Sequence, residues 1–187
     1  MIIQKTFTTA ALIIVCILSV AKLSAQNTED TSGNHFRDDL LDHLVGDWSD
    51  SSTAHGSAFT SYVNVRWVLN HQYILIHLKS KEIVPWWHTE MEYYEYIGYN
   101  HYQKRYTVHG MSIEGDEDIS EGFGYGYRDG NDFKTVAKFG ADTNIVQHFI
   151  WHPETNTWNI QSRAEINGEE EEIFLDMKLT DETRLSK

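Results

Sequence analysis

The sequence is poor in the two residue types that constrain a chain most. It contains one cysteine, Cys16, and two prolines, Pro85 and Pro153, in 187 residues. Because Cys16 lies in a segment that we expect to be removed, the mature protein can form no disulfide, even in an oxidising compartment, and can use no cysteine nucleophile. Long strands tolerate little proline, so the scarcity of proline favours an all-β fold.

Positive charge is also scarce. Fifteen Lys and Arg stand against 28 Asp and Glu. Two of the basic residues, Lys5 and Lys22, lie in the segment expected to be removed, which leaves thirteen and a net charge of −15 with histidine neutral. Such a chain repels nucleic acid, anionic lipid and polyanionic substrates, so we expect no nucleic-acid partner.

The N-terminus has the pattern of a secretory signal peptide. A short basic start at 1–5 is followed by an apolar run at 7–20 and by small residues up to Ala25. The run is shorter than the ~20 residues of a membrane-spanning helix, and the residues before Cys16 are too bulky for a lipidation site. We therefore predict cleavage after Ala25, a periplasmic or secreted protein, and no membrane insertion after cleavage.

The remainder predicts one domain preceded by a flexible lead. Residues 26–34 are polar and without periodicity, and 181–187 form a tail. Between them, apolar residues at helical spacing predict a short amphipathic helix over 35–44, with Asn34 as its N-cap and Gly46 just beyond its end. The domain is expected to span 35–180.

After Gly46 the apolar residues alternate, which is typical of strands. Turn signals such as Asp129-Gly130 and Asn167-Gly168 separate the alternating segments. Expected strands begin at Trp48 and continue at 63–69, 74–78, 88–99, 103–111, 123–127, 133–139, 145–152, 158–166 and 173–179. About ten consecutive antiparallel strands avoid exposed edges by closing. The sequence therefore predicts an all-β, up-and-down barrel with a short N-terminal helix, and a β-sandwich is the alternative.

The start of the first strand resembles that of a known family. Gly46-Asp47-Trp48 follows a short helix, Tyr99-Asn100 and 104–107 lie mid-chain, and Trp158 precedes Asn167-Gly168-Glu169. This order is similar to a family of exported bacterial calycin-like, or lipocalin-type, domains of unknown function. The resemblance implies a barrel whose end is plugged by Trp48, with Gly46 at the strand start, and it implies no catalytic residues.

Aromatic residues are the main candidates for a binding site. The chain holds six Trp, ten Tyr and eight Phe. Paired tryptophans beside Pro85 are expected in a loop at the barrel mouth, where they would stack on a ligand or act as a plug. The alternating Gly122, Gly124 and Gly126 mark either barrel curvature or close approach of a ligand. Candidate ligand-binding residues are Trp67, Trp86, Trp87, Tyr106 and Tyr125.

Acid–base candidates are fewer. His88 and Glu90, two residues apart on an expected strand, would share one face with Glu92. His88 and Glu90, together with Tyr106 and His109, would supply the catalytic residues of an enzyme. The alternative is that the carboxylates simply belong to a solvated outer face.

No metal or cofactor is expected. On a strand His148 and His152 lie ~13 Å apart, too far to share one ion. Residues 116–121 resemble the start of a calcium loop, but position six is Glu121 instead of Gly and position twelve is Tyr127 instead of Glu. Folding should therefore be independent of bound metal.

Three functions stay open. The first is an exported barrel that binds a small apolar or aromatic-faced ligand. The second is an enzyme, such as a lyase, isomerase or hydrolase, that uses the barrel pocket. The third is an interaction protein of the cell envelope with a filled core. The sequence leaves the ligand and the oligomeric state undetermined. A cavity lined by aromatic residues with few polar groups would favour the first.

Overall fold

The structure is a computed structural model that describes residues 36–113, 115 and 121–181. The expected signal peptide, the lead at 26–34, the start of the helix at His35, most of the acidic loop at 116–121 and the tail beyond Asp181 lie outside these residues. Within the described residues, no helix is long and apolar enough to cross a bilayer.

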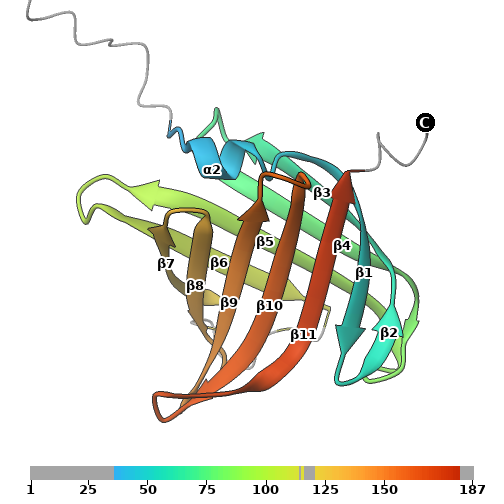
Figure 1. The fold of residues 1–187 in the computed structure, drawn as a ribbon. Coiled ribbons are helices and arrows are strands. Elements are labelled where there is room, and N and C mark those ends of the chain that lie inside the picture. Colours follow the sequence, from blue (N-terminus) through green and yellow to red (C-terminus); the bar gives the residue numbers. More distant parts are fainter. Residues whose placement is uncertain (1–35, 114, 116–120, 182–187) are drawn as a thin grey trace, which may run out of the picture. The chain divides into compact units, whose positions relative to one another are not determined.

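The described chain has one short helix and eleven strands (Figure 1). The elements are α2 (Asp39–Asp42), β1 (Gly46–Ala54), β2 (Ser57–Phe59), β3 (Ser61–Val68), β4 (Tyr73–Val84), β5 (Thr89–Asn100), β6 (Arg105–Ser112), β7 (Phe123–Asp129), β8 (Asp132–Lys138), β9 (Thr143–His152), β10 (Thr157–Ile166) and β11 (Glu169–Asp181).

The sheet closes on itself. Each strand from β3 to β11 pairs antiparallel with the next, β1 pairs with β3, and β1 also pairs with β11 from Trp48↔Asp181 to Ala54↔Leu175. This last pairing confirms the barrel and excludes the β-sandwich. Ten strands form the barrel, and β2 is an extra strand that pairs only with the end of β1.

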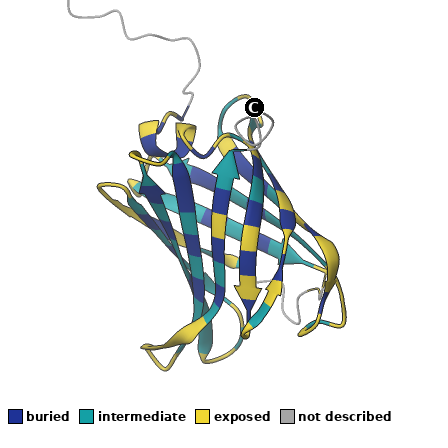
Figure 2. Cartoon of the chain, turned by 45° about the vertical axis from the view of Figure 1, so that its right-hand side comes forward, coloured by how far each residue is buried: buried dark blue, intermediate teal, exposed yellow. Residues whose placement is uncertain are grey.

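Alternation along the strands sorts side chains between the interior and the solvent (Figure 2). On β5 the inward positions are Met91, Tyr93, Glu95, Ile97 and Tyr99, which run in this order from the loop after β4 towards the helix. The intervening residues face outward. A strand of period two thus carries one row of side chains along the whole length of the barrel interior.

The helix differs from the expected one. It begins at Asp39 instead of His35, and its N-cap is Asp38, whose carboxylate accepts from the backbone N–H groups of Leu40 and Leu41 at 2.9 and 3.0 Å. An N-cap carboxylate satisfies the otherwise unpaired first N–H groups of a helix. Residues 36–38 are therefore outside the helix, and Phe36 instead packs on Tyr99 at 5.5 Å between ring centroids.

The helix closes one end of the barrel. Leu40, Leu41 and Leu44 are buried, and Trp48 is 4% exposed and donates from Nε1 to the carbonyl of Leu44 at 2.8 Å. Trp48 therefore packs beneath the helix at this end of the barrel. The same end is filled by further core side chains, including Phe36, Val65, Ile74, Ile97, Phe133, Trp151, Trp158 and Leu179.

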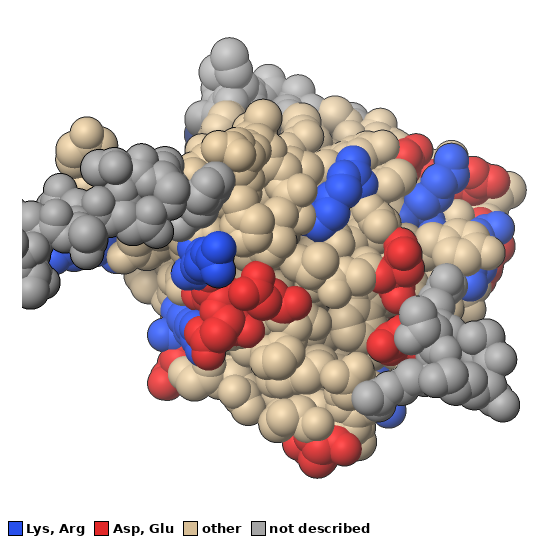
Figure 3. Space-filling model, turned by 90° about the horizontal axis from the view of Figure 1, so that it is seen from above, with Lys and Arg blue, Asp and Glu red and all other residues tan. Residues whose placement is uncertain are grey.

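Polar contacts fix the helix to the barrel wall. Tyr106 on β6 donates its hydroxyl to Asp38. Arg128 on β7 donates from Nη1 to Asp38 at 3.0 Å and to Asp39 at 2.6 Å. Seen from above, this end is covered by side chains, and acidic and basic groups lie side by side on it (Figure 3). A buried N-cap carboxylate that is also ion-paired holds the plug in one position.

Candidate functional site

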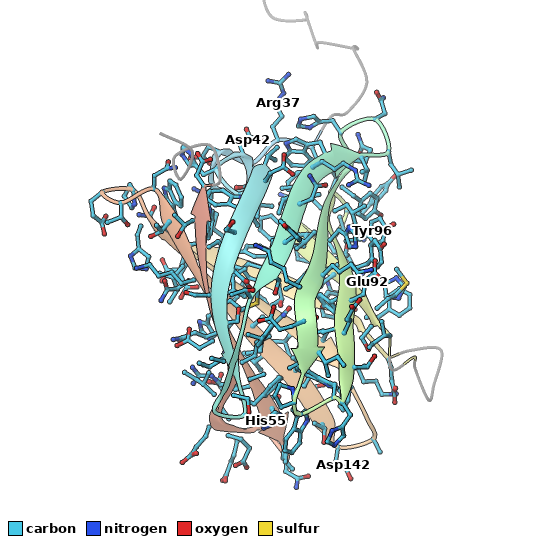
Figure 4. All side chains as sticks on the ribbon, turned by 90° about the vertical axis from the view of Figure 1, so that its right-hand side faces the viewer. Arg37, Asp42, His55, Glu92, Tyr96 and Asp142 are labelled. Carbon is cyan, nitrogen blue, oxygen red and sulfur yellow. The ribbon has the colours of Figure 1, made fainter. Side chains whose placement is uncertain are left out.

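The opposite end of the barrel is hollow. A cavity of about 440 Å³ lies there. Figure 4 shows the two ends: Arg37 and Asp42 mark the helix end, and His55 and Asp142 mark the other. Most side chains that line the cavity are apolar, among them Val63, Ile76, Leu78, Met91, Phe149, Ile160, Phe174 and Met177.

Aromatic side chains stand at the mouth. His55, in the turn between β1 and β2, stacks on Trp86 with 3.7 Å between ring centroids and on Phe174 at 5.4 Å. Trp86 is 56% exposed, while its neighbour Trp87 is half-buried and packs against the core. Both tryptophans line the cavity, as the expected mouth loop requires.

A carboxyl group lies deep in this cavity. Glu95 is 1% exposed and sits on β5 between the packed half, which begins at Ile97, and the open half. Its cross-strand neighbours are Ile76 on β4 and Gly110 on β6. Burial raises the pKa of Glu95 from 4.5 to about 8, and a hydrogen bond from Tyr93 opposes this rise. The group is therefore largely protonated at neutral pH when the cavity is empty.

Gly110 makes room for the partner of Glu95. The Tyr93 hydroxyl lies over Gly110, where even a methyl group would collide with it. From there it hydrogen-bonds to the Glu95 carboxyl, and burial together with this carboxyl raises the pKa of Tyr93 well above its usual value. Tyr93 thus acts as a hydrogen-bond donor and does not ionise near neutral pH.

Gln147 reaches Glu95 from the facing side of the barrel. One atom of its amide lies 3.2 Å from both carboxyl oxygens. When Glu95 is ionised, this atom is the amide nitrogen, which donates. When Glu95 is protonated, the amide oxygen in that place accepts a hydrogen bond from the carboxyl O–H. Thr135 and Ser162 lie 3.3 and 3.4 Å from the two amide atoms, and their hydroxyl groups can rotate to suit either state.

A second buried carboxylate lies outside the cavity. Asp50 on β1 accepts hydrogen bonds from Ser52 at 2.5 Å and from the hydroxyl and backbone N–H of Ser61. Burial raises its pKa, and the hydrogen bonds from these serines oppose the rise. Both carboxylate oxygens of Asp50 thus accept hydrogen bonds near the point where β2 leaves the barrel, and we assign Asp50 a structural role.

The acid–base candidates are not brought together. His88 precedes β5 in a turn with φ of 55°, so it does not share a strand face with Glu90, contrary to the expectation. Glu90 is exposed, 4.0 Å from Lys79 Nζ. His109 is on the outer face of β6, stacked on Phe123 at 3.8 Å. Tyr106 is interior but belongs to the helix end.

The other aromatic candidates also lie away from the cavity. Trp67 is at the helix end and donates from Nε1 to Asp42 at 2.9 Å. Tyr125 is 41% exposed on the outer face of β7, beneath the Arg105 guanidinium at 3.4 Å. The inner face of β7 carries glycines instead. A side chain at Gly126 would meet the ring of Phe133 and the Cβ atom of Tyr106, so only glycine fits inward and the aromatic residues face out.

The cluster of Tyr93, Glu95 and Gln147 was missed by sequence reasoning. The available signal was the position of Glu95 in the strand. Residues two apart share one face, so Glu95 lies on the inward face of β5 with Met91, Ile97 and other apolar residues. A lone acid on an apolar row marks a buried polar site. The acid singled out instead was Glu90, with Glu92 on the same face; Glu90 is exposed, and Glu92 faces outward with Oε1 2.8 Å from His77 Nε2.

No protein-family model matches the chain, and no curated protein matches it. The fold and the cavity therefore define the class on their own: a closed, ten-stranded antiparallel barrel, plugged at one end and hollow at the other. Among the described residues, no cluster of His, Asp and Glu is arranged to hold a metal ion.

Proposed function

We propose that this protein binds a small, largely apolar ligand inside the barrel. The observation that carries the proposal is the cavity of about 440 Å³, with apolar walls and one polar cluster at its inner end. Ligand sites in proteins typically measure ~300–1,000 Å³ and combine apolar walls with a few placed polar groups. An interaction protein with a filled core does not fit this arrangement.

The mouth supports a ligand with a flat or apolar face. Trp86, His55 and Phe174 form a stack of rings at the opening, and a planar ligand can add to this stack through the exposed Trp86 as it enters. The inner cluster then orients whatever polar group the ligand carries. Burial of the apolar part of the ligand supplies affinity, and the polar groups around Glu95 fix the orientation of the ligand.

The enzyme alternative has less support. His88, Glu90 and His109 do not line the cavity, and the hydroxyl of Tyr106 is committed to Asp38. Proton transfer in catalysis requires groups within hydrogen-bond reach of one substrate atom. Four residues distributed over the mouth turn, the outer face and the plugged end do not meet that requirement.

The proposal includes export and membership of the calycin-like barrels. Export is supported by the sequence at 1–25 alone. The calycin-like assignment is supported by the closed barrel and by Gly46 and Trp48 at its first strand. Exported protein should begin at Gln26. Recovery of material that still carries residues 1–25 from the culture medium or periplasm would contradict this.

Native mass spectrometry of protein purified from its own host tests the binding function. We expect a retained small molecule in the wild type and its loss in Ala164→Phe, because Ala164 lines the cavity and a phenyl ring there fills it. Ala58→Phe is the matched control, since Ala58 is exposed on β2. Equal retention by wild type and Ala164→Phe would show that the cavity is not the binding site.

A further inference from the structure

We propose that the ligand carries a protonatable amine, and that Glu95 binds this amine as its counter-ion at the inner end of the cavity. This inference rests on the ligand-binding function proposed above. It assigns the ligand a chemical class, an apolar body with one cationic head group, and it assigns Glu95 the role of specificity-determining residue.

The first support is the missing counter-charge of Glu95. Its partners, Tyr93 and Gln147, are neutral. Among the described residues, no Lys, Arg or His pairs with it. A buried carboxylate normally has a cationic partner, and without one it stays protonated. An ammonium group on the ligand supplies the charge that the protein itself does not.

The second support is the surroundings of Glu95. The residues opposite it on the adjacent strands, Ile76 and Gly110, carry no charge. Among the described residues that line the cavity, the ionisable side chains besides Glu95 and Tyr93 are His55, stacked on Trp86 at the mouth, and Lys138 at the end of β8, which has an interaction of its own. Neither of them influences the pKa of Glu95, so neither compensates its charge in the empty cavity.

The third support is electrostatic selection. The whole chain has a net charge of −13, which attracts cations and repels anions. A ligand carboxylate placed beside Glu95 would meet a like charge or keep both groups protonated. For an ammonium ligand, folding has already buried the neutral carboxyl, so binding costs its ionisation and the desolvation of the ammonium group, and the ion pair gains the stronger attraction of a low-dielectric site. Tyr93 and Phe149 line the same cavity, and an aromatic ring within reach of a cation attracts it further.

Binding must release a proton. Near neutral pH the empty cavity holds protonated Glu95, and the free ligand is an ammonium ion in water. In the complex the carboxylate and ammonium together hold one proton fewer, and that proton passes to the solvent. Because the pKa of Glu95 is about 8 in the empty protein, release approaches one proton at about pH 6 and falls towards zero at about pH 9.5.

Isothermal titration calorimetry with three matched probes tests this inference. Tryptamine, tryptophol and indole-acetic acid share one apolar body and differ in their head group. At about pH 7 we expect tryptamine to bind about tenfold or more tighter than tryptophol, and indole-acetic acid to bind most weakly. Titrations in buffers of different ionisation enthalpy measure the released proton directly.

Variants separate the charge from the cavity. Glu95→Gln keeps the shape and should bind tryptamine and tryptophol within about threefold of each other, with no proton release. Glu92→Gln, on the outer face of the same strand, should behave as wild type. The proton count on the wild-type protein provides a test that does not depend on any variant folding.

Two different failures are distinguishable. If tryptophol or indole-acetic acid binds as tightly as tryptamine, or if binding of tryptamine at about pH 6 releases no proton, the amine inference is overturned while ligand binding stands. If none of the three probes binds and Ala164→Phe retains the same host molecules as wild type, the proposed function itself fails, and the inference falls with it.

Discussion

Replacing Glu95 by Gln should make the protein more stable at alkaline pH, although it removes a fully buried, hydrogen-bonded side chain. The pKa of Glu95 is raised from 4.5 to about 8 by burial. Between these two values the folded protein therefore binds more protons than the unfolded chain. The contribution of Glu95 to stability is therefore fully present below about pH 4.5 and is lost as the pH rises through about 8.

The size of the effect follows from this window. Each pH unit across this window lowers the free energy of unfolding by roughly 1.4 kcal/mol. The full interval from 4.5 to about 8 therefore lowers it by roughly 5 kcal/mol. Small domains have only ~5–15 kcal/mol of stability. The carboxamide that Glu95→Gln introduces can still accept from Tyr93 and bond to Gln147, so the variant should lose little at about pH 5 and exceed the wild type at about pH 9.

Urea unfolding followed by tryptophan fluorescence at several pH values measures this difference. Asp50, whose pKa is also raised by burial, contributes a slope of the same sign to both proteins and cancels in the comparison. Glu171→Gln, at an exposed position on β11, serves as the control and should follow the wild type. Parallel curves for wild type and Glu95→Gln from about pH 5 to about pH 9 would refute the reasoning.

Two further substitutions test the division between the plug and the cavity. Trp48→Ala should cost about 3–5 kcal/mol of unfolding free energy because it deletes a buried ring from the plugged end. Trp86→Ala should change stability little and weaken ligand retention. Equal, small shifts in melting temperature for the two variants would contradict the plug. Gly110→Ala should cost about 1–3 kcal/mol by driving the Tyr93 hydroxyl off Glu95. Gly140→Ala is its control, since the nearest atom to an added methyl group is 3.9 Å away, and equal denaturation midpoints for the two would show that Tyr93 is not held as described.

The strands could be predicted because alternation and turn residues are local signals. Asp129-Gly130 and Asn167-Gly168 lie at hairpins, as expected, and Gly130 and Gly168 have positive φ. The helix start was placed too early because apolar spacing cannot distinguish a residue in the helix from one packed beside it. The extra strand β2 was missed because three residues are too few to show a period.

The cavity could not be predicted because it depends on which face of each strand turns inward. The two-residue alternation divides the side chains of a strand between two faces, but it does not show which face points into the barrel. On β7 the usual preference for large residues inside misleads, because Tyr106 and Phe133 fill the space over Gly126. Tyr125 was therefore placed on the wrong face. For Glu95 the preference for charges outside misleads in the same way, and only the neighbours Met91 and Ile97 reveal its side.

The separation of a packed half from a hollow half along one barrel has a consequence for evolution and engineering. Residues that hold the fold together, such as Trp48 and Leu41, lie at one end, and residues that would select a ligand, such as Ile160 and Met177, face the cavity. Both sets belong to one continuous apolar core, so a substitution in the cavity wall leaves the fold intact where it keeps the side chain apolar and of similar volume. A chain built this way can change its ligand through such exchanges in the hollow half while the packing around Trp48 and Leu41 is kept.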